Sequence, residues 1–275
     1  MKWPPPSSDD NSGRIRRFTE CVRSGELFTA EVLLSPEVLF PTVVLTSGTL
    51  AAIYFYSHYV RRIPMTSEIY PSFFRRRSLF GTVTSVGDGD NFRLFHTPGG
   101  RLMGWGWMPG RKVPTVKKGL RDVTVIHPLR SGKPEGLIGV LQLHVRLAGI
   151  DAPECAHFGK TAQPGSSEAL AWLRNYILSH RVRAYIYRRD QYERVVASVK
   201  VRKGLFRRDV GLEMLKAGMA TVYESKMGAE FGSLEKRYRE AEAVARRQRI
   251  GIWALSKKQF ISPGAYKKGL RERGL

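Results

Sequence analysis

Three short segments of this chain bring together side chains that can hold a divalent cation and bind a phosphate. They are Asp88-Gly89-Asp90, the stretch from Arg146 to Glu154, and the stretch from Asp190 to Arg194. Together they supply two carboxylates suited to a metal, a third carboxylate able to act as a base, and two arginines. Hydrolysis of a phosphodiester with one divalent ion needs these groups, because the phosphate charge must be neutralised and a nucleophile supplied.

Asp90 and Asp151 are the candidate metal ligands. Their carboxylate oxygens are hard ligands, and Ca²⁺ accepts carboxylates, backbone carbonyls and several waters at about 2.3–2.6 Å. The carbonyl of Ala152 could add a ligand without any requirement on its side chain. The sequence therefore predicts a Ca²⁺ site made from these two aspartates and the Ala152 backbone.

Glu154 and the two arginines are the candidates for the chemical step. Glu154 follows Asp151 by three residues, across a proline that stiffens the turn, so it could orient or deprotonate a water near the metal. Arg146 and Arg194 can each donate paired hydrogen bonds to a phosphate as its charge grows. Each segment alone also has an ordinary interpretation, as a hairpin turn, a surface strand residue, a helix entry or a salt-bridge partner. Their conjunction in this order, with strands before each, is much more specific.

The charge balance favours a polyanionic partner. The formal net charge is +22, and residues 1–37 contribute none of the excess. A surplus of this size concentrates nucleic acid or anionic lipid around the protein. A soluble basic surface without such a partner is the alternative. The only cysteines, Cys21 and Cys155, predict neither a disulfide framework nor a cysteine metal site.

The elements that must position these residues are short strands and amphipathic helices. The alternation of apolar and polar residues predicts five strands, over 81–86, 91–95, 141–147, 182–189 and 194–201. Apolar spacing predicts three helices, one after Ser166-Ser167-Glu168, one carrying Val210, Met214 and Leu215, and one from about Ser233 to Gln248. This pattern predicts an α+β fold, an OB-type five-stranded β-barrel with three helices, within a domain over 79–255.

A long insertion, about 96–139, separates the second and third predicted strands. It is rich in glycine and proline, which indicates a functional or disordered loop rather than core. Its Lys112, Lys117, Lys118 and Arg121 could guide a nucleic-acid strand, and Trp105 and Trp107 could stack on bases. A decorated surface flap is an equal alternative.

An apolar stretch lies before this domain. Residues 38–60 contain no charged side chain, and at about 1.5 Å per residue they are long enough to cross a bilayer. The sequence predicts a single transmembrane helix, with a buried core helix as the alternative. Positive charge is denser after the stretch than before it, which predicts that the C-terminal domain stays on the synthesis side of the membrane.

The remaining segments are predicted to be two tails and a linker. Residues 1–37 are expected to form a flexible tail, 61–78 a basic juxtamembrane linker, and 256–275 a frayed basic tail. No protein partner can be inferred from any of them.

Several motifs resemble the staphylococcal-nuclease (thermonuclease-like) family over residues 80–254. The matching segments are Val86-Gly-Asp-Gly-Asp90, Val145-Arg-Leu-Ala-Gly-Ile-Asp-Ala-Pro-Glu154, Asp190-Gln-Tyr-Glu-Arg194, Met214-Leu-Lys-Ala-Gly-Met-Ala220 and Gly251-Ile-Trp253. With the apolar stretch and the insertion, the whole chain resembles the fungal membrane-anchored, mitochondrial probable endonucleases of that family.

The resemblance implies an OB-barrel with Ca²⁺-dependent cleavage of DNA and RNA, and location in a mitochondrial membrane. It places Arg146, Glu154 and Arg194 at catalytic positions and Asp90 and Asp151 on the metal. It also implies that Tyr192 lies near the bound nucleotide. The chain departs from the family pattern at Asn91 and Ala152, which replace the usual threonines.

Two other functions remain open from the sequence. Related barrels also serve as catalytically silent nucleic-acid or partner-binding modules, although none of the acids or arginines above is lost here. Alternatively, the positive charge could face anionic lipid, as in a membrane-surface or assembly protein.

Overall fold

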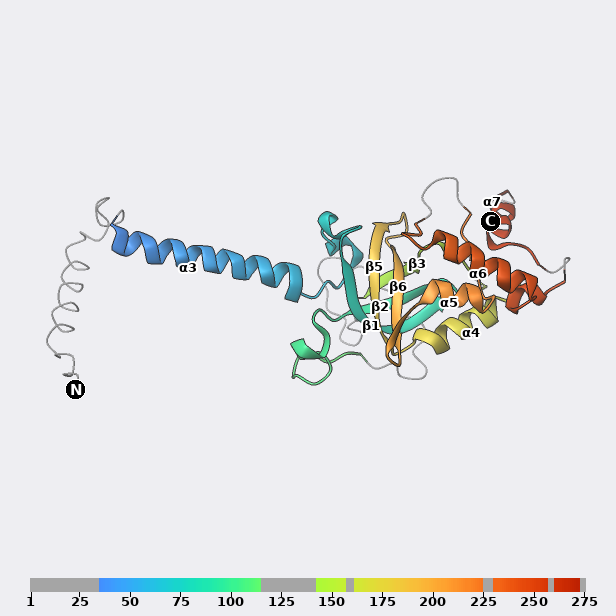
Figure 1. Cartoon of the computed structure of the whole chain (residues 1–275), viewed down its shortest axis with the longest axis horizontal. Helices are drawn as coiled ribbons and strands as arrows, with labels where there is room; N and C mark the ends of the chain where they lie inside the picture. The colour runs from blue at the N-terminus through green and yellow to red at the C-terminus, as the bar shows by residue number, and fades with distance from the viewer. Residues whose placement is uncertain (1–34, 115–141, 157–160, 225–229, 257–259, 273–275) are drawn as a thin grey trace, which may run out of the picture. The chain divides into compact units, whose positions relative to one another are not determined.

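The computed structural model describes residues 35–114, 142–156, 161–224, 230–256 and 260–272 of the chain (Figure 1). The chain divides into two compact units, Met1–Tyr59 and Val60–Leu275. Among the described residues, every buried apolar side chain lies between Ile63 and Ile252. The second unit therefore contains a complete hydrophobic core, and we expect it to fold without the first.

The first unit contains helix α3, Pro36–Phe55, which continues as a π-helical turn, Tyr56–Val60. None of the residues of α3 is buried. The hydroxyl groups of Thr42 and Thr49 donate to backbone carbonyls four residues earlier, so these polar groups are satisfied within the helix. By length and composition, Pro36–Val60 could cross a membrane.

The second unit combines strands and helices. The strands are β1 Ser78–Asp88, β2 Asn91–His96, β3 Leu143–Leu147, β4 Ile150–Asp151, β5 Arg181–Arg189, β6 Val195–Lys203, β7 Phe206–Asp209 and β8 Thr221–Val222. The α-helices are α4 Ser166–Ile177, α5 Val210–Lys216, α6 Glu235–Arg247 and α7 Pro263–Glu272. Short 3-10 turns occupy Thr66–Glu68, Pro71–Phe73, Gly100–Met103 and Gly251–Ala254.

Six of the strands form one sheet in the order β3-β2-β1-β5-β6-β7. Neighbours in this order are antiparallel, and β3 pairs in addition with β6 in parallel, with Val145 opposite Val195. β4 and β8 form a separate two-stranded sheet. The unit is therefore a mixed α+β fold, and the strands that carry Asn91, Arg146 and Val195 lie next to one another.

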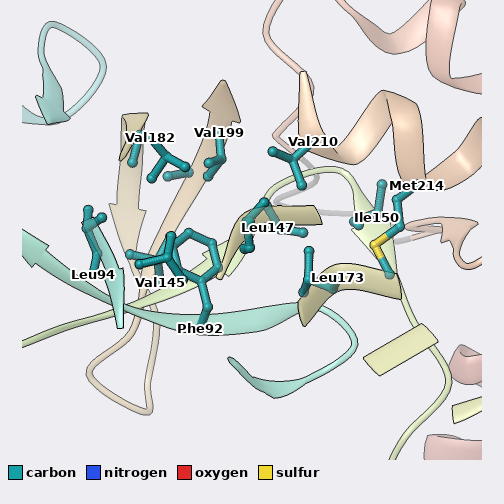
Figure 2. Packing of buried hydrophobic residues seen from close by; sticks show 14 of the residues in the cluster. Phe92, Leu94, Val145, Leu147, Ile150, Leu173, Val182, Val199, Val210 and Met214 are labelled. Atoms are coloured by element: carbon teal, nitrogen blue, oxygen red, sulfur yellow. The ribbon is translucent and has the colours of Figure 1, made fainter. Parts of the chain in front are cut away.

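Strand alternation explains the core. In β3 the buried residues Leu143, Val145 and Leu147 alternate with the partly exposed His144 and Arg146. Figure 2 shows Phe92, Val145, Leu147 and their neighbours turned toward one another. The buried positions of each strand thus face the core, and the polar positions between them face outward.

Helices α4, α5 and α6 lie together at one end of this sheet (Figure 1). α4 packs against β1 and buries Ala169, Leu173 and Ile177. α5 packs against β6 and α6. Its N-terminus is capped by Asp209, whose Oδ1 accepts a hydrogen bond from the Leu212 N–H at 2.9 Å.

All five predicted strands and all three predicted helices are present, with boundaries shifted by a few residues. The sixth strand of the main sheet, β7, was not predicted. The prediction of a frayed C-terminal tail was wrong for residues 263–272, which form α7. Gly165, with φ of 85°, rather than Ser166, occupies the N-cap of α4.

The predicted insertion is described only up to residue 114, and Lys117, Lys118 and Arg121 lie outside the described residues. The prediction that Trp105 could stack on bases was wrong, because its side chain is buried. Its indole packs edge-on against Phe95, with ring centroids 5.8 Å apart, and its Nε1 donates to the carbonyl of Pro98. Trp107, by contrast, is 63% exposed.

Candidate active site

The Asp88-Gly89-Asp90 turn between β1 and β2 is buried against the segment that follows β4. Asp88 and Asp90 are both buried, and so is Ala152. A Cβ at Gly89 would lie 2.7 Å from the Cβ of Ala152, so only glycine allows this approach. The close contact holds the turn beside Asp151, although the two segments are separated by 60 residues of sequence.

Arg146 joins the two segments electrostatically. Its Nε lies 3.2 Å from Oδ2 of Asp90, and its Nη2 lies 3.2 Å from Oδ1 of Asp151. Burial disfavours the charge on the guanidinium, but Asp90 and Asp151 outweigh this effect and raise the pKa of Arg146. The two predicted metal ligands therefore converge on one cation, which is the side chain of Arg146.

The backbone of Asp151 is fixed by a distant part of the chain. β4 pairs with β8, and the hydroxyl of Thr221 donates to the Asp151 carbonyl at 3.2 Å. Tyr223, directly after β8, places its ring 5.4 Å from the guanidinium carbon of Arg146. The segment 221–223 is thus part of the frame of the site.

Glu154 lies at the edge of the same cluster. Its charge contributes to the pKa shifts of both Asp88 and Arg146, which places it in their neighbourhood. Gln163 brackets its backbone: the Gln163 side-chain oxygen accepts from the Glu154 N–H at 3.2 Å, and the Gln163 N–H donates to the Glu154 carbonyl at 2.9 Å. The turn that carries Glu154 is therefore held in place by residues just before α4.

Asp88 is a carboxylate of the site that the sequence analysis did not assign to it. Its Oδ1 accepts from the N–H of Gly89 at 2.7 Å and of Cys155 at 3.4 Å. Burial, together with the nearby charge of Asp90, raises the pKa of Asp88. Burial also raises the pKa of Cys155 to about 12, so its thiol remains protonated and is not a nucleophile.

Arg194 and Tyr192 form a second cluster with Asp190. Nε of Arg194 lies 2.7 Å from Oδ2 of Asp190, and Oδ1 of Asp190 accepts from the backbone N–H groups of Tyr192 and Arg194. Burial would raise the pKa of Asp190, but its hydrogen bonds with Arg194 outweigh burial and lower it. Tyr192 is 66% exposed, with its ring 5.0 Å from the guanidinium carbon of Arg194.

His144 connects the two clusters, although the sequence analysis gave it no role. Its Nε2 lies 3.3 Å from Oδ1 of Asn91, the residue after Asp90. Burial, followed by the charges of Arg93 and Arg194, lowers the pKa of His144 to about 4. Arg194 therefore lies close enough to the first cluster for its charge to act on a neighbour of Asp90.

The described residues thus bring Asp90, Ala152, Arg146, Asp151 and Glu154 into one neighbourhood, with Arg194 and Tyr192 beside it. Thr221, Tyr223 and Gln163 were missed because no local pattern marks them. Only the pairing of β4 with β8 brings residue 221 to residue 151, and such a pairing of two-residue strands leaves no periodicity in the sequence.

Comparison with known proteins gives a consistent result. The family model described as "Staphylococcal nuclease homologue" matches residues 144–255, which include Arg146, Asp151, Glu154 and Arg194. "Probable endonuclease lcl3" of Sclerotinia sclerotiorum is 59% identical over 232 residues, covering 84% of this chain and 81% of the relative. "Probable endonuclease LCL3" of Pyricularia oryzae is 52% identical over 268 residues, covering 97% and 95%. The similarity to these fungal proteins therefore extends well beyond the matched domain.

Proposed function

The chain belongs to the staphylococcal nuclease homologue family, and from that premise we propose that it is a membrane-anchored, Ca²⁺-dependent endonuclease acting on DNA, RNA or both. The printed names of its relatives support nuclease chemistry. The observation that carries the proposal is the convergence of Asp90 and Asp151 on the single cation of Arg146. A net charge of +22 suits a polyanionic substrate.

The donor set fits a hard divalent cation. Asp90 and Asp151 are buried and carry oxygen ligands, and the single positive charge of Arg146 compensates only one of their two negative charges, which leaves charge for a divalent cation to neutralise. The described residues contain no group of three His, Cys, Asp or Glu side chains that could hold a metal ion. The proposed ligands are therefore the two carboxylates and the Ala152 carbonyl, completed by water. When bound, Ca²⁺ would neutralise charge on the phosphate.

The chain's own residues would then perform the proton transfer and hold the phosphate. We assign Glu154 as the base that accepts a proton from water while the water oxygen bonds to phosphorus and the bond to the leaving oxygen breaks; the leaving oxygen takes a proton from solvent. Arg146 remains cationic and donates to the phosphate oxygens as their charge increases. Arg194 donates from the neighbouring cluster, and Tyr192, exposed beside it, is available to the nucleotide.

The strand pairings support an OB-type barrel as the frame of this site. β1 pairs with β2 and β5, and β3 pairs with β2 and β6. Since β5 also pairs with β6, the five strands are connected in a ring of pairings. The sixth strand, β7, extends β6 outside this ring.

The membrane anchor and the mitochondrial location rest on separate grounds. Support for the anchor comes from Pro36–Val60, whose length and composition suit a membrane span. The mitochondrial location follows from the family resemblance. Alkaline carbonate extraction of isolated mitochondria tests both: an anchored protein stays in the membrane pellet. Release into the soluble fraction would contradict the membrane anchor, and absence from mitochondria would contradict the mitochondrial location.

Cleavage of circular single-stranded DNA by the 60–275 fragment tests the chemistry. Linear products in Ca²⁺, and none with a chelator, are expected, because an exonuclease cannot attack a circle. Glu154→Gln should reduce the rate by about 10³-fold or more. Glu168→Gln, an exposed carboxylate on α4, is the matched control and should retain activity.

A catalytically silent nucleic-acid-binding module on the same fold is the second candidate. It would follow if Arg146 stays in its ion pairs with Asp90 and Asp151 and does not reach a phosphate. Salt-sensitive binding of nucleic acid without any turnover in Ca²⁺ would establish this alternative and reject the nuclease.

A further inference from the structure

The hairpin between β6 and β7 exposes two large apolar side chains at its tip. The two-residue turn is Gly204-Leu205, and Gly204 has φ of 61°, as such tight hairpins require. Leu205 is 85% exposed and Phe206, the first residue of β7, is 67% exposed. A single exposed apolar residue is common on protein surfaces. Two adjacent ones at a turn form a small apolar patch, which a partner with an apolar surface can cover.

Basic side chains surround this tip on both strands. They are Arg202 and Lys203 on β6, and Arg207 and Arg208 on β7. Arg202 lies directly opposite Arg207 across the two strands, an arrangement of like charges that destabilises a sheet. Nε of Arg202 donates to the Gly204 carbonyl at 3.0 Å, and no ion pair with an acid in the described part of the chain includes either of these two arginines. An anion outside the protein would relieve this repulsion.

A hollow of about 340 Å³ opens beside the tip. Five basic side chains line it: Lys200, Arg207, Arg208, Lys216 and Arg237. Its two acids are already engaged, since Asp209 is buried as the cap of α5 and Glu213 pairs with Lys216 at 2.8 Å. The hollow therefore has the charge and size to receive a phosphate-bearing group.

The combination favours a lipid bilayer over nucleic acid. Basic residues attract both, and Phe206 could stack on a base, but Leu205 has no π-system with which to stack. At a membrane surface, apolar side chains enter the boundary between headgroups and acyl chains while arginines stay at the level of the phosphates. A helix that could span a membrane, Pro36–Val60, lies in the same chain and ends 17 residues before β1.

We propose that the β6–β7 hairpin is a second membrane contact, in which Leu205 and Phe206 enter an anionic bilayer surface while Arg202 and Arg207 bind phospholipid headgroups. This contact is independent of the nuclease chemistry. Arg194 precedes the first residue of the nine-residue strand β6 and the tip follows its last, so about 30 Å of strand separates them. A domain held at both places would approach the membrane with one defined face.

Vesicle sedimentation of the 60–275 fragment tests the contact without the α3 helix. The fragment should bind vesicles containing phosphatidylglycerol and not vesicles of phosphatidylcholine alone. Leu205→Ser/Phe206→Ser should weaken binding roughly tenfold. The matched control is Leu102→Ser, because Leu102 is 96% exposed in a different loop, and it should bind like the wild type.

A charge-matched pair separates a specific contact from general attraction. Arg202→Gln/Arg207→Gln should lower vesicle binding by roughly tenfold or more, whereas Arg101→Gln/Arg247→Gln, which removes the same charge elsewhere, should have a small effect. All variants should keep their thermal unfolding midpoint and their cleavage of a short oligonucleotide in Ca²⁺. If the wild type does not cleave the oligonucleotide, the proposed nuclease function is rejected, but the proposed membrane contact is not.

A second readout uses the full chain in vesicles. An environment-sensitive fluorophore on Leu205→Cys, with Cys21 and Cys155 replaced by serine, should report an apolar surrounding in anionic vesicles, while the same fluorophore on Glu240→Cys should report water. Three results would overturn the proposal: an aqueous signal at position 205, equal binding of anionic vesicles by the tip variant and the wild type, or a signal at 205 that responds to an oligonucleotide and not to lipid.

Discussion

Arg146 and Arg194 both bind carboxylates, but they do so in opposite ways. Arg146 binds Asp151, five residues later in the chain, and also Asp90, 56 residues earlier, so the second of these ion pairs exists only when distant segments meet. Arg194 binds Asp190, four residues earlier in the same turn. The first cluster is thus a product of the tertiary fold and the second a product of local sequence. We expect stability and activity to be coupled at Arg146 and separable at Arg194.

The largest effect is expected at Arg146. Arg146→Ala should lower cleavage by about 10³-fold or more and reduce the free energy of unfolding by about 2–4 kcal/mol, because two buried aspartates lose their counter-charge. Saturating Ca²⁺ should restore part of this stability, since the metal replaces the missing positive charge. Chemical unfolding with and without Ca²⁺ measures both. An equally stable variant in chelator would show that Asp90 and Asp151 do not need the guanidinium.

Substitution of Arg194 should affect cleavage much more than stability. Arg194→Ala is expected to lower cleavage by about 10²-fold but to change the free energy of unfolding by only about 1 kcal/mol, because Asp190 keeps its bonds from two backbone N–H groups. Kinetics and urea unfolding on the same samples provide the comparison. A stability loss as large as that of Arg146→Ala would remove the distinction between the clusters.

Gly89 tests whether the first cluster depends on contact between segments. Gly89→Ala should cost about 1–3 kcal/mol, because the added Cβ would meet Ala152 at 2.7 Å and the turn that carries Asp90 must move. The Ca²⁺ affinity of Gly89→Ala, measured by calorimetry, should also be lower than that of the wild type. The control is Gly204→Ala, where no atom lies within 4 Å and only the positive φ opposes the change. Unchanged Ca²⁺ affinity in Gly89→Ala would show that the turn's position does not matter.

The smallest effect is the acid response of Asp190. Its pKa is lowered in the folded protein, so the stabilisation it provides is present above its ordinary unfolded pKa and is lost as the pH falls through the folded value. Because solvent screens this turn, we expect a contribution of about 0.5 kcal/mol or less. Wild type and Asp190→Asn should therefore differ at neutral pH and converge once the pH has fallen below the folded pKa of Asp190. A difference that grows in acid would have the wrong sign.

The same contrast explains what the sequence could predict. Alternation marked β1, β2, β3, β5 and β6 because each buries one face. β7 was missed because three of its four residues are exposed, so no alternation is visible. α7 was missed because its lysines and glycines resemble those of a frayed tail. Trp105 was misjudged because its burial depends on Phe95 and Pro98, which a composition argument cannot place.

The sequence identified which residues form the site, but it did not predict how they contact one another. The motifs identified Asp90, Asp151, Glu154 and both arginines as candidates. They could not indicate that Arg146 would bind both aspartates, because that contact requires β2, β3 and β4 to be assembled. Roles assigned from sequence spacing alone therefore omit the ion pairs of Arg146 with Asp90 and Asp151, which must give way when Arg146 binds a substrate phosphate.

The pairing of β8 with β4 has a consequence for the timing of activity. Translation proceeds from the N-terminus, so a nascent chain of about 195–220 residues contains every acid and arginine of the site but lacks the segment that fixes Asp151. Under the proposed nuclease function, the ribosome-bound polypeptide would therefore stay inactive until β8 pairs with β4. Activity would arise only once residues 221–223 have emerged and Thr221 holds the Asp151 backbone.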